Sequence, residues 1–235
     1  MHFRFFLPGW CPLLSKADHL NTHPKKLLLN QSERLAPRHC ALVVIDMQND
    51  FCAQDGYVEK VVGKDAAACR DIVAPVNELV DAAHKSGVTV IWIAARYGVE
   101  QIPANMRAKQ LHLSDAICCA DKSWGADFFG VSPADGEKIF FKHTYSAFIG
   151  TGLADYLADH EIRTLAFAGV QTNVCVENSV RDAFCRGFYC VVAEDCVASH
   201  TQALHDATLQ NVRFLYGDVI NRESIIRHWS DGVSR

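Results

Sequence analysis

Short apolar runs alternate with longer amphipathic segments along most of this chain. The runs are near-continuous in their apolarity, which is typical of strands buried on both faces of a parallel sheet. They cover residues 41–45, 88–93, 138–141, 164–168, 190–193 and 212–215. Between them, helical patterns span about 65–86, 152–160, 174–187, 200–210 and 222–230. This alternation predicts an α/β fold, in which an open parallel sheet carries helices on both faces.

Two segments depart from this rhythm. Residues 95–137 form a long connection that contains prolines, glycines and several aromatic residues. Connections of this length usually serve as lids or interfaces, so we expect either a lid or a subunit interface here. The first 37 residues contain two short, apolar and slightly basic stretches. We predict that residues 1–37 are an N-terminal arm, packed on the domain or on a neighbouring subunit, and that residues 38–235 are one domain.

Composition narrows the class of protein. Hydrophobic residues make up 49% and charged residues 21% of the 235 residues, the balance of a soluble globular domain. The net charge of -4 provides no basic surface for nucleic acid or for an anionic membrane, and we expect neither partner. The ten cysteines include no Cys-x-x-Cys pair, and a domain of this size needs no disulfides. We therefore expect a reducing, cytoplasmic location.

Three residues with useful chemistry lie at or after the ends of predicted strands. Asp46 follows five apolar residues, Lys142 follows the run at 138–141, and Cys175 comes shortly after the run at 164–168. In an open α/β sheet, ligands bind beyond the carboxyl ends of the strands. The three side chains are therefore expected at one edge of the sheet. Each also has an ordinary alternative: a turn-forming acid, a solvated lysine and a structural thiol.

The local sequence suggests a role for two of them. Asp46 is expected to be half buried, which would raise its pKa and suit it to act as a base. Cys175 comes after the polar turn at 169–174 and opens a predicted helix. Unpaired N–H groups at a helix start lower a thiol pKa and can hold an oxyanion, so we expect a reactive thiol. Cys185, in the middle of the same helix, lacks this field.

The histidines do not suggest a metal site. His200 and His205 are five residues apart, which does not place them on one face of a helix. His143, next to Lys142, is an alternative base, although an exposed or core histidine is the more common case. We expect no metal and no cofactor.

Three ordered motifs resemble those of the isochorismatase-like cysteine hydrolases. The first is the segment 43–51 around Asp46, the second is Lys142 followed by residues 145–148, and the third is the segment 169–183 around Cys175. The resemblance runs from about residue 41 to residue 217. It implies a six-stranded parallel sheet and a catalytic triad of Asp46, Lys142 and Cys175.

The resemblance also implies features around the triad. Members of this family carry a cis peptide bond before the nucleophile turn, which corresponds here to Val170–Gln171. This bond would direct the N–H of Gln171, beside that of Cys175, at a substrate oxyanion. Members are usually dimers or larger oligomers, so we expect a homo-oligomer, either a dimer or a tetramer.

The motifs separate branches of the family. Nicotinamidases bind a metal through a histidine-containing segment after the second strand, where this chain has residues 94–98 without histidine, and isochorismatases commonly lack the cysteine. The chain is most similar to the ureidoacrylate, biuret and carbamoyl-amide hydrolases. The resemblance thus implies a hydrolase of non-peptide C–N bonds that takes a small amide or ureido substrate and releases ammonia through a thioester-type intermediate.

Four aromatic residues are expected to contact that substrate: Phe51, Trp124, Tyr145 and Phe148. Core packing explains the two phenylalanines equally well. Three alternatives for the function remain at this point. These alternatives are a nicotinamidase, an isochorismatase-type hydrolase, and a non-catalytic binding or scaffold member of the family.

Overall fold

The sheet has six parallel strands and a single reversal of strand order. A computed structural model describes residues 26–112 and 114–233. The strands run in the order β3-β2-β1-β4-β5-β6, and every neighbouring pair is parallel. Their bounds are β1 (Cys40–Ile45), β2 (Thr89–Ala95), β3 (Lys138–Lys142), β4 (Thr164–Val170), β5 (Tyr189–Ala198) and β6 (Gly217–Ile220). The predicted open six-stranded α/β fold is confirmed.

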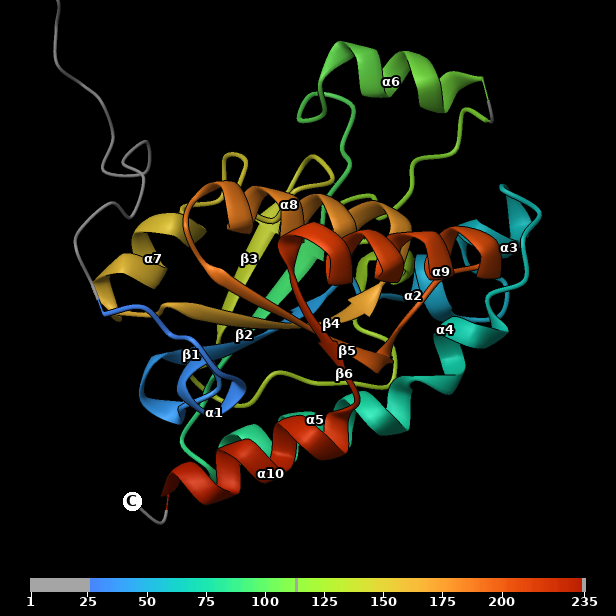
Figure 1. The fold of residues 1–235 in the computed structure, drawn as a ribbon. Helices are drawn as coiled ribbons and strands as arrows, with labels where there is room; N and C mark the ends of the chain where they lie inside the picture. Colours follow the sequence, from blue (N-terminus) through green and yellow to red (C-terminus); the bar gives the residue numbers. More distant parts are fainter. Residues whose placement is uncertain (1–25, 113, 234–235) are drawn as a thin grey trace, which may run out of the picture.

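Helices cover both faces of the sheet (Figure 1). One face carries α5 (Val73–Lys85) and α10 (Arg222–Val233), and the other carries α7 (Leu153–Asp159), α8 (Glu177–Cys185) and α9 (Gln202–Asn211). Successive residues of β1 alternate between the two apolar clusters, so that Leu42 packs toward α5 while Val43 packs toward α8. All six residues of β1 are buried. This is why the sequence of β1 is continuously apolar.

Shorter helices occupy the connections. The α-helices among them are α1 (Gln31–Arg34), α2 (Asn49–Cys52), α3 (Tyr57–Lys60), α4 (Ala67–Asp71) and α6 (Ala104–Leu111). The 3₁₀-helices are η2 (Pro37–His39) and η3 (Trp124–Ala126), and the π-helices are η4 (Thr172–Val176) and η5 (Val212–Tyr216). The helix predicted at 65–86 is therefore two helices, α4 and α5. In Figure 1, α6 projects from the long connection, away from the body of the domain.

The prediction of a strand at residues 212–215 is wrong. These residues form η5, a π-helical extension of α9, and the last strand begins at Gly217. Val212 is buried, whereas Phe214 and Leu215 are largely exposed. A short apolar run does not distinguish a strand from a helix whose apolar residues lie partly in solvent.

The part of the predicted arm that the structure describes packs on the domain. Leu35 is completely buried in the apolar cluster on the face of the sheet that carries α5 and α10. Arg34 forms an ion pair of 2.8 Å with Asp218 of β6. Residues 1–25 lie outside the described residues, so the arm as a whole remains a prediction. Among the described residues, no helix combines the length and apolarity needed to cross a membrane.

Gly169 fixes the contact between the two central strands, and its replacement should destabilise the fold. Its φ is +111°, and an added Cβ would lie 2.0 Å from the carbonyl oxygen of Ile45 in β1. We expect Gly169→Ala to lower the free energy of unfolding by about 3 kcal/mol or more, through backbone strain and overpacking. Gly87→Ala is the control, because φ there is +69° but the space is open, and it should cost about 1 kcal/mol. Urea unfolding measures both, and equal losses would contradict this role.

Candidate active site

The reversal of strand order places two of the predicted residues side by side. β1 lies between β2 and β4, so the chain leaves its carboxyl end in one direction and later returns on the other side. Asp46 directly follows β1, with a left-handed φ of 51°, and the turn that carries Cys175 directly follows β4. Such a switch point is where open α/β sheets bind their ligands. Lys142, the last residue of β3, completes the group from the far side of β2.

Lys142 is the centre of the site. Its Nζ forms an ion pair of 2.8 Å with Oδ2 of Asp46 and lies 3.3 Å from Sγ of Cys175. It also donates to the hydroxyl of Tyr97 and to the carbonyl oxygen of Thr144, both at 3.0 Å. Asp46 and Lys142 have no exposed surface, and Cys175 has 4%. The sequence-based expectation that Asp46, Lys142 and Cys175 meet at one edge of the sheet is confirmed.

Burial decides the charge state of the three groups. It raises the pKa of Asp46, and the Lys142 ammonium offsets part of this effect. Burial lowers the pKa of Lys142, but Asp46 and Cys175 together outweigh this effect and leave that pKa raised. Burial and the Asp46 carboxylate together raise the pKa of Cys175 to about 12, although Lys142 acts in the opposite direction. Burial therefore favours a neutral thiol on Cys175 in the resting site, whereas Lys142 favours the charged form of Asp46 against the effect of burial.

This result corrects one prediction and extends another. The expectation that the pKa of Cys175 is lowered is wrong, because desolvation and the neighbouring Asp46 carboxylate raise it. The predicted rise in the pKa of Asp46 is confirmed in direction, and its burial is complete rather than partial. A carboxylate with a raised pKa next to a thiol is suited to accept the thiol proton during a reaction.

The turn that carries Cys175 is held from both sides. The peptide bond between Val170 and Gln171 is cis, at the position where the family resemblance places such a bond. The carbonyl oxygen of Gln171 accepts the N–H groups of Val174 and Val176, at 3.0 and 3.2 Å. Its side-chain oxygen accepts the backbone N–H of His200 at 3.0 Å. The side chain of Gln171 is thus a support for the turn, and only its backbone N–H remains as a candidate for an oxyanion.

The residues after Asp46 anchor the segment 118–129 over the site. The buried side chain of Gln48 donates to the carbonyl oxygens of Ala95 and Ala126, at 3.1 and 2.7 Å. Asn49 donates to the carbonyl oxygen of Trp124 at 2.7 Å. Asp50 accepts the N–H of Cys119 at 2.6 Å. The motif that follows the first strand therefore positions a part of the long connection that is distant in sequence.

The four predicted substrate contacts occupy different environments. Phe51 and Phe148 are buried in the apolar clusters on opposite faces of the sheet, in keeping with the core-packing alternative. Trp124 is 56% exposed in η3, and Tyr145 is 39% exposed. Burial raises the pKa of Tyr145, and negative charge on Cys175 acts in the same direction. Tyr145 is thus the predicted contact with a direct electrostatic link to the site.

Tyr97 is a site residue that the sequence did not reveal. It follows β2 by two residues, so its position beyond a strand end was the available signal. Its buried hydroxyl accepts from Lys142 and lies 3.8 Å from Sγ of Cys175. Lys142 Nζ also contacts the Asp46 carboxylate and the carbonyl oxygen of Thr144, so the charge of Lys142 should stay compensated when the Tyr97 hydroxyl is lost.

Replacement of Tyr97 by phenylalanine should therefore affect turnover more than folding. We expect kcat to fall about tenfold, the equivalent of one hydrogen bond of about 1.4 kcal/mol. Tyr189→Phe is the matched control, because its hydroxyl accepts the N–H of Leu28 at the other end of the sheet, and it should leave kcat unchanged. Steady-state kinetics would contradict the role of Tyr97 if both variants turned over like the wild type.

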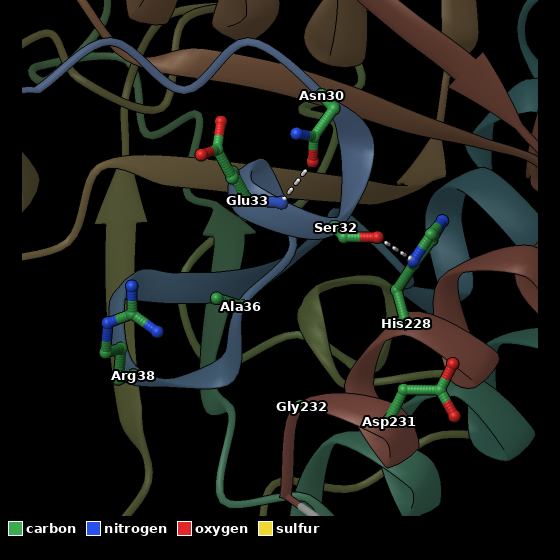
Figure 2. Close-up of a pocket in the computed structure, with 8 residues that line it drawn as sticks. All are labelled: Asn30, Ser32, Glu33, Ala36, Arg38, His228, Asp231 and Gly232. Carbon is green, nitrogen blue, oxygen red and sulfur yellow. Dashed lines mark hydrogen bonds between the residues drawn. The ribbon is translucent and has the colours of Figure 1, made fainter. Parts of the chain in front are cut away.

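One cavity lies far from these residues. Figure 2 shows it between α1 and α10, near the amino end of β1. Its lining carries charges of both signs, and Ser32 contacts His228 across it at 3.3 Å. Because Asp46 follows the opposite end of the same strand, this cavity plays no part in the arrangement around Cys175.

Comparison with known proteins agrees with this geometry. The isochorismatase domain model matches residues 40–224. The ureidoacrylate amidohydrolase RutB of Klebsiella pneumoniae (strain 342) is 31% identical over 209 residues, which are 83% of this chain and 88% of that protein. A cysteine hydrolase from Pseudomonas syringae pv. phaseolicola 1448A has the same fold, with a TM-score of 0.75 and 24% identity, over 83% of this chain and 94% of that one.

N-carbamoylsarcosine amidase from Thermoplasma acidophilum also shares the fold. Its TM-score is 0.65 at 23% identity, and the match covers 78% of this chain and 96% of that one. The domain model spans most of the chain and includes Asp46, Lys142 and Cys175. The chain therefore belongs to the isochorismatase family, as its three motifs predict, and is a hydrolase.

Proposed function

We propose that this chain is a cysteine-dependent amidohydrolase that cleaves the C–N bond of a small linear amide or ureido compound and releases ammonia. One observation carries the proposal. A single buried ammonium, that of Lys142, contacts both the Asp46 carboxylate at 2.8 Å and the Cys175 sulfur at 3.3 Å. A nucleophile, a base and a fixed positive charge in direct contact are the components needed for covalent acyl transfer.

The reaction begins with proton transfer. Asp46 accepts the proton of Cys175 as the sulfur attacks the substrate carbonyl carbon and a C–S bond forms. The N–H groups of Gln171 and Cys175 stabilise the oxyanion. The tetrahedral intermediate then collapses, its C–N bond breaks, and Asp46 returns the proton to the nitrogen, which leaves as ammonia.

Hydrolysis of the acyl-enzyme restores the site. Asp46 accepts a proton from water, the resulting hydroxide attacks the thioester or thiocarbamate carbon, and the C–S bond breaks. The leaving thiolate takes the proton back from Asp46. Lys142 remains protonated throughout, because its pKa is raised by Asp46, and it balances the negative charge that passes from Asp46 to sulfur.

The names of the relatives support the choice of substrate class. The similar RutB proteins are ureidoacrylate amidohydrolases, and a structural neighbour is an N-carbamoylsarcosine amidase. Both names describe a small organic acid whose nitrogen carries a carbamoyl group. Of the four predicted contacts, the partly exposed Trp124 and Tyr145 remain the proposed walls for such a substrate, with Tyr145 best placed to contact it.

An ammonia-release screen tests this proposal. The purified chain is assayed with ureidoacrylate, biuret, an N-carbamoyl amino acid and nicotinamide. We expect kcat/KM for the best ureido or carbamoyl compound to exceed that for nicotinamide by about 100-fold or more. A site that hydrogen-bonds a ureido or carbamoyl-amino group rejects an amide that lacks this group. A preference for nicotinamide would favour the nicotinamidase alternative. No release from any compound by the folded chain would favour a binding role.

A further inference from the structure

Two neighbouring thiols in the segment over the active site lie close together. The sulfur atoms of Cys118 and Cys119 are 3.9 Å apart, and both side chains are buried. In an extended chain, neighbouring side chains point to opposite sides. Here Cys119 has a left-handed φ of 48°, which residues other than glycine rarely adopt. A conformation of this kind is retained where the surrounding structure or a function requires it.

A carboxylate completes the group. The ligand atoms of Asp50, Cys118 and Cys119 all lie within 4.8 Å of one another, and they form a potential metal-binding group among the described residues. Oδ2 of Asp50 accepts the N–H of Cys119 at 2.6 Å, and Oδ1 accepts that of Tyr57 at 3.1 Å. Each carboxylate oxygen has two lone pairs, so each keeps one. Carboxylates that bind metals are commonly oriented by such hydrogen bonds.

We propose that Asp50, Cys118 and Cys119 bind a thiophilic divalent cation, with Zn²⁺ as the physiological candidate. A tetrahedral zinc with Zn–S bonds of about 2.3 Å separates its two sulfur ligands by about 3.8 Å. The observed separation of 3.9 Å fits this value without a change in the backbone. Thiolates select zinc over magnesium and calcium. The three protein ligands leave a fourth position for water.

The binding step is balanced without an oxidant. Two S–H bonds break, two Zn–S bonds form, and two protons pass to solvent, so the net charge of the group does not change. The competing chemistry is a disulfide between the two neighbours. A disulfide has an S–S distance of about 2.05 Å, so the sulfur atoms would have to approach by about 1.9 Å. The observed spacing is that of two free thiols, in which Cys118 donates to Cys119 and Cys119 donates to the carbonyl oxygen of Gly125, and not that of a disulfide.

The site is separate from the catalytic triad but linked to it. Tyr97 donates its backbone N–H to the carbonyl oxygen of Cys119 at 3.3 Å, and its hydroxyl lies beside Lys142 and Cys175. A bound ion would join the segment 118–129 to α2 next to the active site. The expectation of no metal rested on histidine spacing, and it did not consider this pair of thiols.

Cobalt and zinc titrations of the reduced, chelator-treated full-length Cys175→Ala chain test this proposal. Removal of Cys175 prevents the nucleophile from serving as a ligand. We expect one Co²⁺ per chain, with a sulfur-to-cobalt charge-transfer band of two thiolates, displacement by one Zn²⁺, and release of about two protons per ion at neutral pH. In the same background, Cys118→Ser should weaken binding by about 100-fold or more, since even changes outside the ligand shell reach that range. Cys185→Ser, at an exposed thiol, should leave binding unchanged.

Several results would overturn the proposal. These are the absence of stoichiometric Co²⁺ binding, a Co²⁺ spectrum without a sulfur-to-cobalt charge-transfer band, an unchanged affinity of Cys118→Ser for Co²⁺, or a Cys118–Cys119 disulfide in the purified chain. Cys119→Ser is a second ligand variant, but Cys119 is completely buried. If that variant does not fold, the band of the folded chain still reports the number of thiolates. None of these readouts depends on turnover, so they are independent of the proposed amidohydrolase activity.

Discussion

Replacement of Cys175 by alanine is expected to reduce ammonia release by about 10⁴-fold or more while the chain still folds. The reason is that the proposed mechanism forms its covalent bond at the Cys175 sulfur, which lies 3.3 Å from Lys142. The change removes one sulfur atom, and Lys142 keeps Asp46 and the carbonyl oxygen of Thr144 as partners, so the free energy of unfolding should fall by only about 1 kcal/mol. A coupled ammonia assay measures the first effect, and urea unfolding measures the second.

Two other cysteines provide matched controls for this variant. Cys190 in β5 is also buried, and burial raises the pKa of its thiol far above the usual value. Cys185 is exposed at the end of α8. Cys190→Ala and Cys185→Ala should both retain wild-type turnover, which separates loss of a nucleophile from loss of a buried or an accessible thiol. Undiminished turnover by Cys175→Ala would disprove the mechanism.

Replacement of Lys142 by methionine is expected to affect both activity and stability. The variant keeps the length of the side chain but leaves the completely buried Asp46 carboxylate without its 2.8 Å partner. Removal of one member of a buried ion pair costs about 3–5 kcal/mol in the free energy of unfolding. Turnover should fall about 10³-fold, because the negative charge passed to sulfur is no longer balanced. Lys138→Met, at an exposed position in the same strand, should change neither quantity.

The pH dependence of that stability loss has a definite sign. Burial raises the pKa of Asp46 and Lys142 lowers it, so removal of Lys142 moves the folded-state pKa further above the unfolded value. A group with a raised folded-state pKa contributes full stability below its unfolded pKa, near 4, and loses it as the pH rises through the folded pKa. The deficit of Lys142→Met relative to wild type should therefore be small near pH 4–5 and large near pH 8.

A double variant isolates the buried charge as the cause. Asp46→Asn together with Lys142→Met removes both charges, and it should recover most of the stability lost by Lys142→Met alone. Urea unfolding at both pH values makes the comparison. A deficit in Lys142→Met that is independent of pH, or that persists unchanged in the double variant, would mean that packing rather than charge holds the site together.

The location of the site could be predicted from the sequence because it depends on topology. Asp46, Lys142 and Cys175 lie at or just beyond the carboxyl ends of β1, β3 and β4, and parallel strands bring these ends to one edge. The continuous apolar runs indicated which segments are strands, since both faces of the sheet are covered. That inference failed at residues 212–215, where the apolar run belongs to η5 and two of its large side chains face solvent.

The chemistry inside the site was less predictable. The pKa of Cys175 depends on complete burial and on a carboxylate distant in sequence, and these outweigh the local helix start that the sequence displays. Tyr97 lay in segments considered for their lack of metal ligands and as part of a lid or interface, and not for a contact with Lys142 or Cys175. The positioning roles of Gln48, Asn49 and Asp50 depend on where the segment 118–129 folds, which no local pattern specifies.

Mass spectrometry of a rapidly quenched reaction, first of the intact chain and then of its peptides, tests the central claim most directly. The wild-type chain is mixed with its best ureido or carbamoyl substrate, quenched in acid during turnover and digested. The mechanism predicts one acyl or carbamoyl adduct per chain, located on the peptide that contains Cys175 and absent from Cys175→Ala. Turnover without an adduct at any quench time, or an adduct on another residue that forms and decays at the rate of turnover, would contradict Cys175 as the nucleophile.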